Sequence, residues 1–396
     1  MNYLAFIALV SALVATGAMS MDMYIPSFPG MAADLAASAG DVQLTMSVFL
    51  FGFAGSQLVY GPLSDRFGRR RVLVWGMFIF VVASIACIFA ATVEMLIGLR
   101  LIQAFGACSG AVVGRAMVRD RFESNEAAKA FGYLGMTMML APILSPILGA
   151  WLELAFGWRS NFAVMAGFGG AVLLVTVFLL TETNASPDPD ATRISRIATN
   201  YLALLRNRRF MGYALSLSFA FAGTFAFVTG SSFVMIDLLA VSPDNFAIMF
   251  GLVAGGYLVG SFASTRLVSR LGVDRAIALG ATIYVSAALV LIWLAGVGQF
   301  SIWSICPPMV VLSFGNGLVI PNCQAGAMSP FPRMAGAAAA LMGCFSMVGA
   351  GLGGATVAGF YNATQYPMIL TTLFSAMALF LCFWLLIWRG REPADP

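Results

Sequence analysis

The sequence predicts an all-α polytopic membrane protein with about twelve transmembrane helices, arranged as two pseudo-symmetric bundles of six. Composition is the first observation behind this prediction, because 60% of the 396 residues are hydrophobic and only 10% are charged. Soluble domains have a smaller apolar share. The second observation is that apolar runs of roughly 20 residues, the length of a helix across a bilayer, recur from end to end. A membrane β-barrel would instead show short segments of alternating polarity.

The expected helices are the apolar runs that are bounded by charged residues or by Pro/Gly clusters. They lie near residues 4–28, 41–60, 72–91, 94–117, 127–156, 159–181, 211–235, 245–268, 276–296, 300–324, 335–361 and 366–388. The first run has no basic leading segment and no clear cleavage site. We therefore interpret it as a retained helix and not as a signal peptide.

One long polar stretch, residues 181–209, lies near the midpoint and separates six helices from six. We expect an N-terminal six-helix bundle (1–181), a cytoplasmic linker (182–209), a C-terminal six-helix bundle (210–390) and a cytoplasmic tail (391–396). The linker begins as a flexible Pro/Asp-rich segment. Residues 193–209 form either a basic amphipathic helix on the membrane surface or a solvated loop.

The two halves share a weak internal repeat. SDRFGRR (64–70) follows the second expected helix and SRLGVDR (269–275) follows the eighth. Aligning Gly68 with Gly272 gives an offset of 204 residues, about half of the chain. Duplicated six-helix halves are a known plan of membrane transporters, with the substrate site near the middle of the membrane.

Basic residues gather at alternate connections between the expected helices. When the first residues are placed in the cytoplasm, only Arg100 and Arg159 lie toward the outside. This is the positive-inside pattern, and it places both termini in the cytoplasm. The net charge of +4 therefore reflects orientation, and no nucleic-acid partner is expected.

The chain has no histidine, and its six cysteines lie within apolar runs without forming a C-x-x-C pair. Histidine metal sites, histidine proton relays and a disulfide framework are therefore not expected. We expect no metal and no cofactor. An enzyme would lack evident catalytic residues, and a receptor would lack a soluble signalling domain.

The loop GPLSDRFGRRR (61–71) places an acid, several arginines and two glycines between the second and third helices. It resembles the signature loop of the major facilitator superfamily (MFS), G-x-x-x-D-R-x-G-R-R. The matching residues are Gly61, Asp65, Arg66, Gly68, Arg69 and Arg70, and the pair Arg119 and Asp120 resembles the superfamily's Arg-Asp pair at the end of the fourth helix. The resemblance implies the MFS fold and a charge network that closes the inner side of the bundles. The alternative is that the arginines only fix the topology.

RLIQAFGACSG (100–110) in the fourth helix resembles the superfamily's Arg-x-x-Gln-Gly motif through Arg100 and Gln103, with Ala104 where glycine is usual. An arginine inside an apolar run costs roughly 3 kcal/mol on insertion scales, so it should have a partner. Asp22 is the expected partner, because both residues lie six positions from the outer end of their helices. Alternatively, Asp22 caps a short first helix or lies at the surface.

Two further stretches resemble drug exporters. SMDMYIP near the end of the first helix matches the Asp-x-Tyr-x-Pro pattern of the Bcr/CflA drug-resistance transporters through Asp22, Tyr24 and Pro26. GYLGMTMMLAPILSPILGAW (132–151) in the fifth helix resembles the superfamily's antiporter motif, although Ala141, Ser145 and Ala150 replace glycines. The residues expected to form the motif are Gly132, Pro142, Pro146 and Gly149. Ordinary packing of small residues is the alternative.

We expect a largely apolar substrate cavity. Its candidate lining residues, each of which could also face lipid or the core, are Tyr24, Phe49, Phe53, Met136, Met139, Phe221, Phe225 and Tyr257. Gln103 and Asn316 are the candidate polar residues, because an uncompensated amide in lipid is costly. Arg115 either extends to the inner surface or adds a charge to the cavity. Aromatic and Met-rich walls favour broad specificity.

With this resemblance, the residues predict proton-coupled export of small amphiphilic molecules such as phenicols or bicyclomycin. Asp22 and Arg100 are the candidate coupling residues, because burial favours a neutral carboxyl and a nearby arginine favours an ionised one. The resemblance also implies a monomer in a bacterial inner membrane, whose partners are a small-molecule substrate, protons and the bilayer. The alternative is an MFS symporter or facilitator that imports a small metabolite, which the exporter-like fifth helix disfavours.

Overall fold

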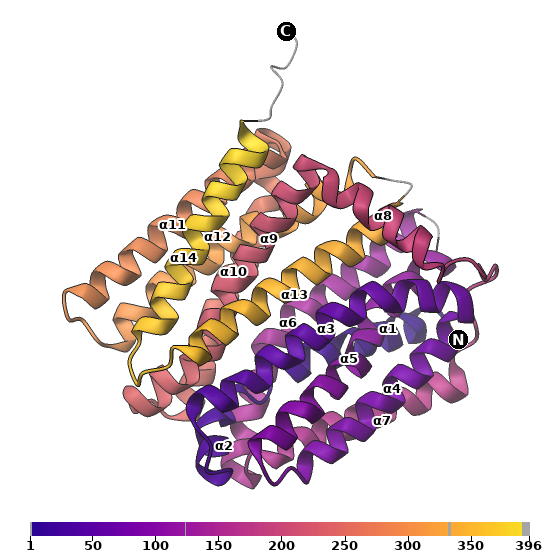
Figure 1. Cartoon of the computed structure of the whole chain (residues 1–396). Coiled ribbons are helices and arrows are strands. Elements are labelled where there is room, and N and C mark those ends of the chain that lie inside the picture. Colours follow the sequence, from indigo (N-terminus) through magenta and orange to yellow (C-terminus); the bar gives the residue numbers. More distant parts are fainter. Residues whose placement is uncertain (1, 123, 332–333, 390–396) are drawn as a thin grey trace. The chain divides into compact units, whose positions relative to one another are not determined.

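The computed structural model describes residues 2–122, 124–331 and 334–389 (Figure 1). Within these ranges every regular element is a helix, and twelve helical segments are long and apolar enough to cross a membrane. The predicted fold class is confirmed. The predicted tail (391–396) lies outside the described residues.

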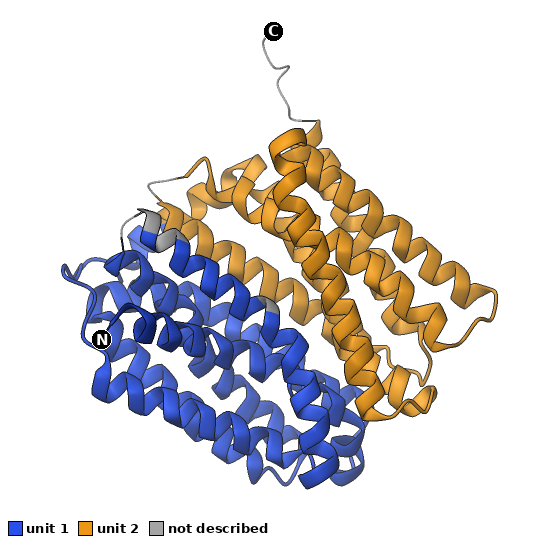
Figure 2. Cartoon of the chain, turned by 180° about the vertical axis from the view of Figure 1, so that it is seen from behind, with its two compact units in different colours: residues 1–198 blue, residues 199–396 orange. Residues whose placement is uncertain are grey.

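The chain forms two compact units, residues 1–198 and 199–396 (Figure 2). The boundary between them falls within helix α8 (Ile194–Arg206), inside the predicted linker. The second part of the linker is therefore helical and not a loop, while its place on the membrane surface stays a prediction.

The first unit contains the six N-terminal membrane-spanning segments. Its elements are α1 (Tyr3–Asp22), η1 (Ile25–Ser27), α2 (Phe28–Asp34), α3 (Ala39–Phe67), α4 (Arg69–Ile88), α5 (Val93–Arg121), α6 (Ser124–Phe156) and α7 (Arg159–Leu179). The first predicted helix (4–28) was wrong in one respect, because α1 ends at Asp22 and two shorter turns follow. Pro26 and Pro29 lie in the first turns of η1 and α2, where a residue without an N–H is tolerated.

The second unit contains the six C-terminal segments. Its elements are α9 (Arg208–Ser232), the π-helical turn η2 (Phe233–Leu238), α10 (Pro243–Leu271), α11 (Val273–Gly296), α12 (Ile302–Met328), α13 (Ala335–Gly359), α14 (Tyr366–Phe383) and the π-helical turn η4 (Trp384–Trp388). These boundaries agree with the predicted spans to within a few residues.

Small residues bring the helices of each unit close together. In the first unit α5 packs on α3 and α4, and in the second α12 packs on α10 and α11. A side chain on Gly106 of α5 would overlap the backbone of Phe80 in α4, and one on Gly110 would overlap the carbonyl of Leu13 in α1. Close backbone approach of this kind is how membrane helices gain van der Waals contact.

The internal repeat extends well beyond the loop that suggested it. Helices α3 and α10 are both 29 residues long, and a shift of 204 positions superimposes their boundaries. Each begins after a serine cap, Ser38 or Ser242, whose side chain accepts a backbone N–H. Shortly before each cap an alanine has a positive φ, 49° at residue 36 and 53° at residue 240. Equivalent caps and turns at a constant offset indicate that one structural pattern was used twice.

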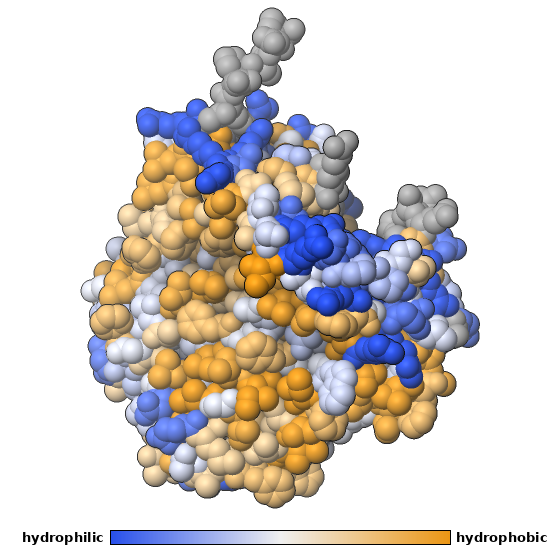
Figure 3. Space-filling view, turned by 45° about the vertical axis from the view of Figure 1, so that its right-hand side comes forward, coloured by the Kyte–Doolittle hydropathy of each residue, from blue (hydrophilic) through white to orange (hydrophobic). Residues whose placement is uncertain are grey.

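The surface is as apolar as a membrane protein requires. Figure 3 shows hydrophobic side chains over much of the face it presents, with hydrophilic side chains gathered mainly in its upper half. Large side chains stand fully outward on several helices, such as Trp75 on α4, Phe178 on α7 and Trp303 on α12, which are 67%, 76% and 79% exposed. Monomeric soluble proteins do not expose apolar surface on this scale.

Candidate functional site

Arg100 of α5 is fully buried inside the first unit. Its guanidinium donates to the Ser20 carbonyl of α1 at 2.7 Å and to Gln103 Oε1 at 2.5 Å. The rings of Tyr24 and Phe49 lie 4.3 and 4.1 Å from its central carbon. Arginine stacks on aromatic rings through cation–π attraction, which is strongest where water is excluded. This arrangement, which we call the Arg100 cage, therefore stabilises a cation in the membrane-spanning part of the unit.

The Arg100 cage connects to further buried polar groups. Gln103 donates to Ser84 Oγ of α4 at 2.8 Å, and the Tyr24 hydroxyl lies 3.0 Å from Thr45 Oγ1 of α3. Four helices are thus joined around one charge. Hydrogen bonds of this kind satisfy amide and hydroxyl groups that have no access to water.

Asp22 lies two residues beyond Ser20, at the last position of α1, and is 7% exposed. Asp22 and Arg100 therefore lie at a similar level of the helix bundle, as predicted, since Arg100 donates to the Ser20 carbonyl. The predicted ion pair does not form, because none of the ion pairs among the described residues involves Asp22 or Arg100. The physical reason is that two carbonyl oxygens and two aromatic rings already surround the guanidinium. The low exposure of Asp22 also rules out the surface-carboxylate alternative in this conformation.

The predicted cavity residues divide between the units. In the first unit, Tyr24, Phe49 and Gln103 belong to the Arg100 cage, and Phe53 is 5% exposed next to Phe49. The Met136 side chain is 60% exposed, and the side chain of Met139 lies outside the described residues.

In the second unit, Asn316 of α12 is 2% exposed and donates to Thr224 Oγ1 of α9 at 2.7 Å. Phe221 and Phe225, also on α9, stack with ring centroids 6.3 Å apart. Tyr257 of α10 is half-buried. The structure therefore joins Asn316 of α12 to α9, the helix that carries the phenylalanine pair.

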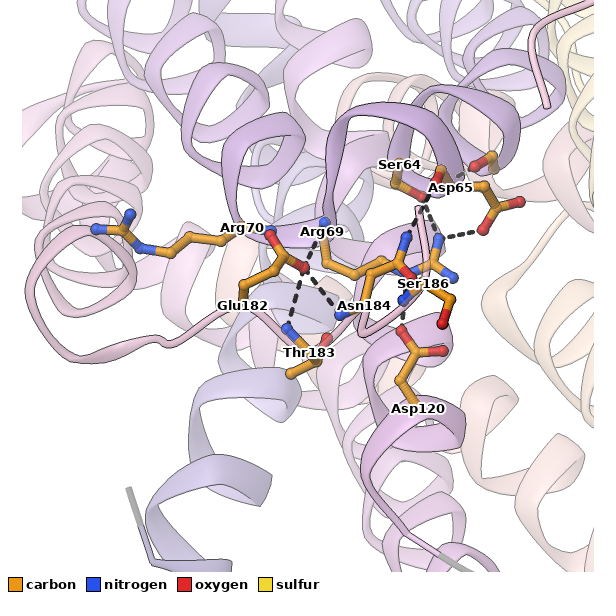
Figure 4. A network of polar contacts seen from close by, with 10 residues as sticks. Ser64, Asp65, Arg69, Arg70, Asp120, Glu182, Thr183, Asn184 and Ser186 are labelled. Atoms are coloured by element: carbon orange, nitrogen blue, oxygen red, sulfur yellow. Dashed lines mark hydrogen bonds and ion pairs between the residues drawn. The ribbon is translucent and has the colours of Figure 1, made fainter. Parts of the chain in front are cut away.

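The predicted signature loop forms an ion network at one end of the first unit (Figure 4). Arg69 bridges two acids, with its guanidinium 2.5 Å from Asp65 and 2.8 Å from Asp120 of α5. It also donates to Ser64 Oγ at 2.7 Å. Gly68 makes the turn between α3 and α4 with φ 92° and ψ 149°, a combination that is essentially restricted to glycine.

Glu182, which follows α7, was missed by the sequence analysis. Its two carboxylate oxygens accept the backbone N–H groups of Arg69 at 2.8 Å and Arg70 at 3.1 Å. These are the first N–H groups of α4, which have no partner inside the helix. Because Gly68 has no side chain to cap them, Glu182 supplies a cap from another element, and its negative charge complements the helix dipole. The sequence offered one signal for this cap, because Glu182 is a single acid between the last apolar residues of α7 and the polar linker.

Two further arginines of the loop, Arg70 and Arg66, bind neutral groups. Arg70 donates to the Val177 carbonyl of α7 at 2.6 Å, and Arg66 donates to Thr192 Oγ1 of the linker at 2.5 Å. The Asp65 carbonyl accepts from Asn184 Nδ2 at 3.0 Å and from the Asp188 N–H at 3.1 Å. The loop is therefore anchored to α5, α7 and the linker, which is more than an orientation signal requires.

The other predicted members of this loop and its surroundings contribute less. Arg119 is exposed at the end of α5, and Gly61 has no neighbour within 4 Å of the place of a Cβ. In the linker, the Asp190 N–H and the Arg196 guanidinium hold the pKa of Asp188 below its ordinary value.

Comparison with known proteins decides the family. Residues 10–354 match the family model described as Major Facilitator Superfamily. The chain belongs to this superfamily. The resemblance seen in the signature loop is therefore confirmed, and the protein is a multi-pass membrane transport protein and not an enzyme.

Curated relatives within the superfamily cover almost the whole chain. Multidrug resistance protein D of Escherichia coli is 30% identical over 385 residues, which is 97% of this chain and 96% of that protein. A bicyclomycin resistance protein homolog of Haemophilus influenzae is 29% identical over 351 residues, covering 89% and 88%. Among solved structures, a mutant of the nucleoside transporter NupG matches with a TM-score of 0.77 at 12% identity, over 98% of this chain and 100% of that one. The last likeness concerns the fold alone.

The stretch that resembles the superfamily's antiporter motif lies on α6. Pro142 and Pro146 lie within this helix. A side chain on Gly149 would overlap the carbonyl oxygen of Met23, directly after Asp22. Gly132 is exposed, with nothing within 4 Å of the place of a Cβ. Only the Gly149 end of the motif therefore makes the close packing that small residues allow.

The second unit carries a charge cluster of its own that the sequence analysis did not identify. Asp274, in the first turn of α11 after Gly272, accepts from the Tyr213 hydroxyl at 2.5 Å and from Arg209 at 3.1 Å. Both donors lie in the first turns of α9. The loop at the 204-residue offset therefore also ties two helices through an acid.

Arg115 is half-buried on α5 and donates through Nε to the Ala111 carbonyl at 2.8 Å. This bond to its own helix is compatible with both alternatives considered for the residue.

Proposed function

We propose that this protein exports small amphiphilic, drug-like molecules in exchange for protons by alternating access. The printed names of two relatives, a multidrug resistance protein and a bicyclomycin resistance protein homolog, support drug export as the activity. We extend this to bicyclomycin-like and phenicol-like compounds. We further propose a bacterial inner membrane as the location, with both termini in the cytoplasm and a single chain as the working unit.

The observation that carries proton coupling is the position of Asp22. It is a buried carboxyl group at the C-terminal end of α1, and no hydrogen bond or ion pair to it is found among the described residues. The C-terminal end of a helix carries partial negative charge, which opposes an ionised carboxylate. An isolated buried charge is costly, so such a group tends to take up a proton. We assign Asp22 as the carboxyl that binds the exchanged proton.

Arg100 gives this carboxyl two possible states. The Arg100 cage holds the guanidinium through the Ser20 carbonyl, two residues before Asp22. A small rearrangement of the end of α1 would replace that carbonyl by the carboxylate and favour its ionised form. Protonated Asp22 apart from Arg100 and ionised Asp22 paired with it are then the two states that transport alternates between.

The substrate class follows from the residues that we assign to the cavity. Aromatic side chains dominate, and Asn316 is the main polar group because the Gln103 amide is already engaged by Arg100 and Ser84. A wall of this kind binds apolar and weakly polar molecules with little geometric restriction. A sugar would need many more hydrogen-bonding partners than these residues supply.

Proton release driven by substrate in everted membrane vesicles tests the proposal. Wild-type vesicles are expected to lose their pH gradient when bicyclomycin or a phenicol is added. The Asp22→Asn variant should lose this response entirely while purified protein still binds the compound. Asp244→Asn, which changes an exposed acid in the first turn of α10, is the matched control and should respond as wild type does. An unchanged response of Asp22→Asn would refute coupling through this residue.

A further inference from the structure

The segment that follows Asp22, residues 23–34, is docked along α6 and α7. Asn161 of α7 donates to Ser27 Oγ at 3.0 Å. Trp158 donates to Asp34 Oδ2 at 3.0 Å, and Arg159 forms an ion pair with the same carboxylate. On α6, a side chain at Gly30 would overlap the carboxylate of Glu153. Glu153 therefore lies against the backbone of α2.

Two acceptor atoms at this docking surface have no donor. Glu153 Oε2 and Asn161 Oδ1 are both buried and make no hydrogen bond. Asn161 is fully buried, and its Oδ1 points at Gly149, one helical turn before Glu153 on α6. Ser27 contacts both residues, because it accepts from Asn161 Nδ2 and its hydroxyl lies against the Glu153 carboxylate. Buried polar atoms are rarely left without a partner.

The arginine that docks the segment onto α7 already has partners other than Glu153. Arg159 of α7 is engaged by Asp34 and by the carbonyls of Ile88 and Ala90. Asp34 of α2 lies close enough for its negative charge to oppose a second one on Glu153. The surroundings of Glu153 thus supply the Ser27 hydroxyl and the like charge of Asp34.

We propose that Glu153, with Ser27 and Asn161, is a second proton-binding site of this transporter, separate from Asp22. A proton on Oε2 removes the uncompensated charge and converts one acceptor into a donor. The proton therefore relieves the unsatisfied oxygen of Glu153 itself.

The position of this site links it to the end of α1. The docked segment begins directly after Asp22, and its Met23 carbonyl packs against Gly149 on the same face of α6 as Glu153. Ionisation of Glu153 in place would leave its Oε2 without a donor and add a second negative charge near Asp34. The segment would then be held less firmly at the place where α1 stops.

Infrared difference spectroscopy on the purified full-length protein tests the proposal without a transport substrate. Acidification produces a carbonyl stretching band for each carboxyl group that takes up a proton. The Glu153→Gln variant is expected to lose one band of a buried carboxylic acid that Asp22→Asn keeps. Glu94→Gln, which changes an exposed acid in the first turn of α5, should retain every band of a buried carboxylic acid. A Glu153→Gln spectrum equal to that of wild type would overturn the proposal, whatever the behaviour of Asp22.

A second measurement uses the wild-type chain and so does not depend on how the variant folds. Dicyclohexylcarbodiimide reacts with protonated carboxyl groups in apolar surroundings, and mass spectrometry identifies the modified peptide. Modification of Glu153 that rises as the pH falls is expected, with Glu94 unmodified. Absence of label on Glu153 at acidic pH, where a label appears on Asp22, would show that Glu153 does not carry a proton.

Discussion

At the scale of single residues, the Arg100 cage explains how an arginine is accommodated in a membrane-spanning helix. Placing it there costs roughly 3 kcal/mol on insertion scales. Each hydrogen bond to a charged group returns about 1.5–3 kcal/mol, and Arg100 makes two. Stacking on the rings of Tyr24 and Phe49 adds of order 1 kcal/mol each. The cage can therefore offset the cost without any carboxylate.

This account predicts the effect of replacing Arg100. Arg100→Met should lower the stability of the purified protein by about 2 kcal/mol, because Gln103 Oε1 would remain buried without its donor. The stability of Arg100→Lys should fall between those of wild type and Arg100→Met, since an ammonium keeps the charge but does not stack as a planar guanidinium does. Thermal unfolding in detergent measures both changes. Arg71→Met, on an exposed arginine of the signature loop, serves as the control and should stay within about 0.5 kcal/mol of wild type.

Residues differ in how far their roles can be predicted from sequence. Arg100, Gln103 and Asp22 are conspicuous because polar side chains within long apolar runs need partners. Glu153 is not, because an acid near the end of a helix usually lies at the surface. It becomes half-buried only because residues 28–34 turn back over α6, and that turn depends on contacts with distant residues of α7.

At the scale of elements, the spans were predictable because the bilayer fixes their length and water-exposed caps fix their ends. The end of α1 at Asp22 was not predicted, although Pro26 and Pro29 indicate a break in the first span. An uninterrupted apolar run outweighed them in the prediction. The cap that Glu182 forms on α4 was hidden for another reason, since it joins residues more than 100 positions apart.

Glu182 gives the prediction that belongs to this scale. Glu182→Gln replaces one acceptor oxygen by an amide nitrogen, so the N–H of Arg69 or Arg70 loses its partner and the charge at the start of α4 disappears. We expect a loss of about 1 kcal/mol and faster hydrogen exchange confined to the first turn of α4.

Exchange measured by mass spectrometry on peptides from this turn checks the prediction. Glu94→Gln again provides the comparison, because Glu94 also lies in the first turn of a helix but is exposed and α5 is capped by Thr92. Equal exchange in Glu182→Gln and wild type would mean that another group caps α4.

At the scale of the whole molecule, the 204-residue repeat places the same glycine turn after α3 and after α10, with different charge contacts around each turn. Gly68 and Gly272 occupy equivalent turns with nearly the same backbone, φ 92° and ψ 149° against φ 78° and ψ 165°. The sequence suggested this equivalence from a single degenerate motif. The two loops nevertheless rely on acids at different places in the chain. In the first unit Arg69 binds Asp120 of the fourth span, whereas in the second unit the acid, Asp274, belongs to the loop itself. The sequence motif did not indicate this difference.

The paired glycines separate backbone strain from steric overlap. Gly272→Ala should lower stability by roughly 1–3 kcal/mol, the cost of a non-glycine residue in this region of φ and ψ, because nothing lies within 4 Å of the place of its Cβ. Gly68→Ala carries the same strain and also drives a methyl group against the Glu182 carboxylate. Its loss should therefore exceed that of Gly272→Ala in thermal unfolding. In a Glu182→Ala background the overlap is removed, so the two alanine variants should then lose similar stability. If Gly68→Ala still costs more in that background, the two turns are not equivalent and the repeat does not extend to their energetics.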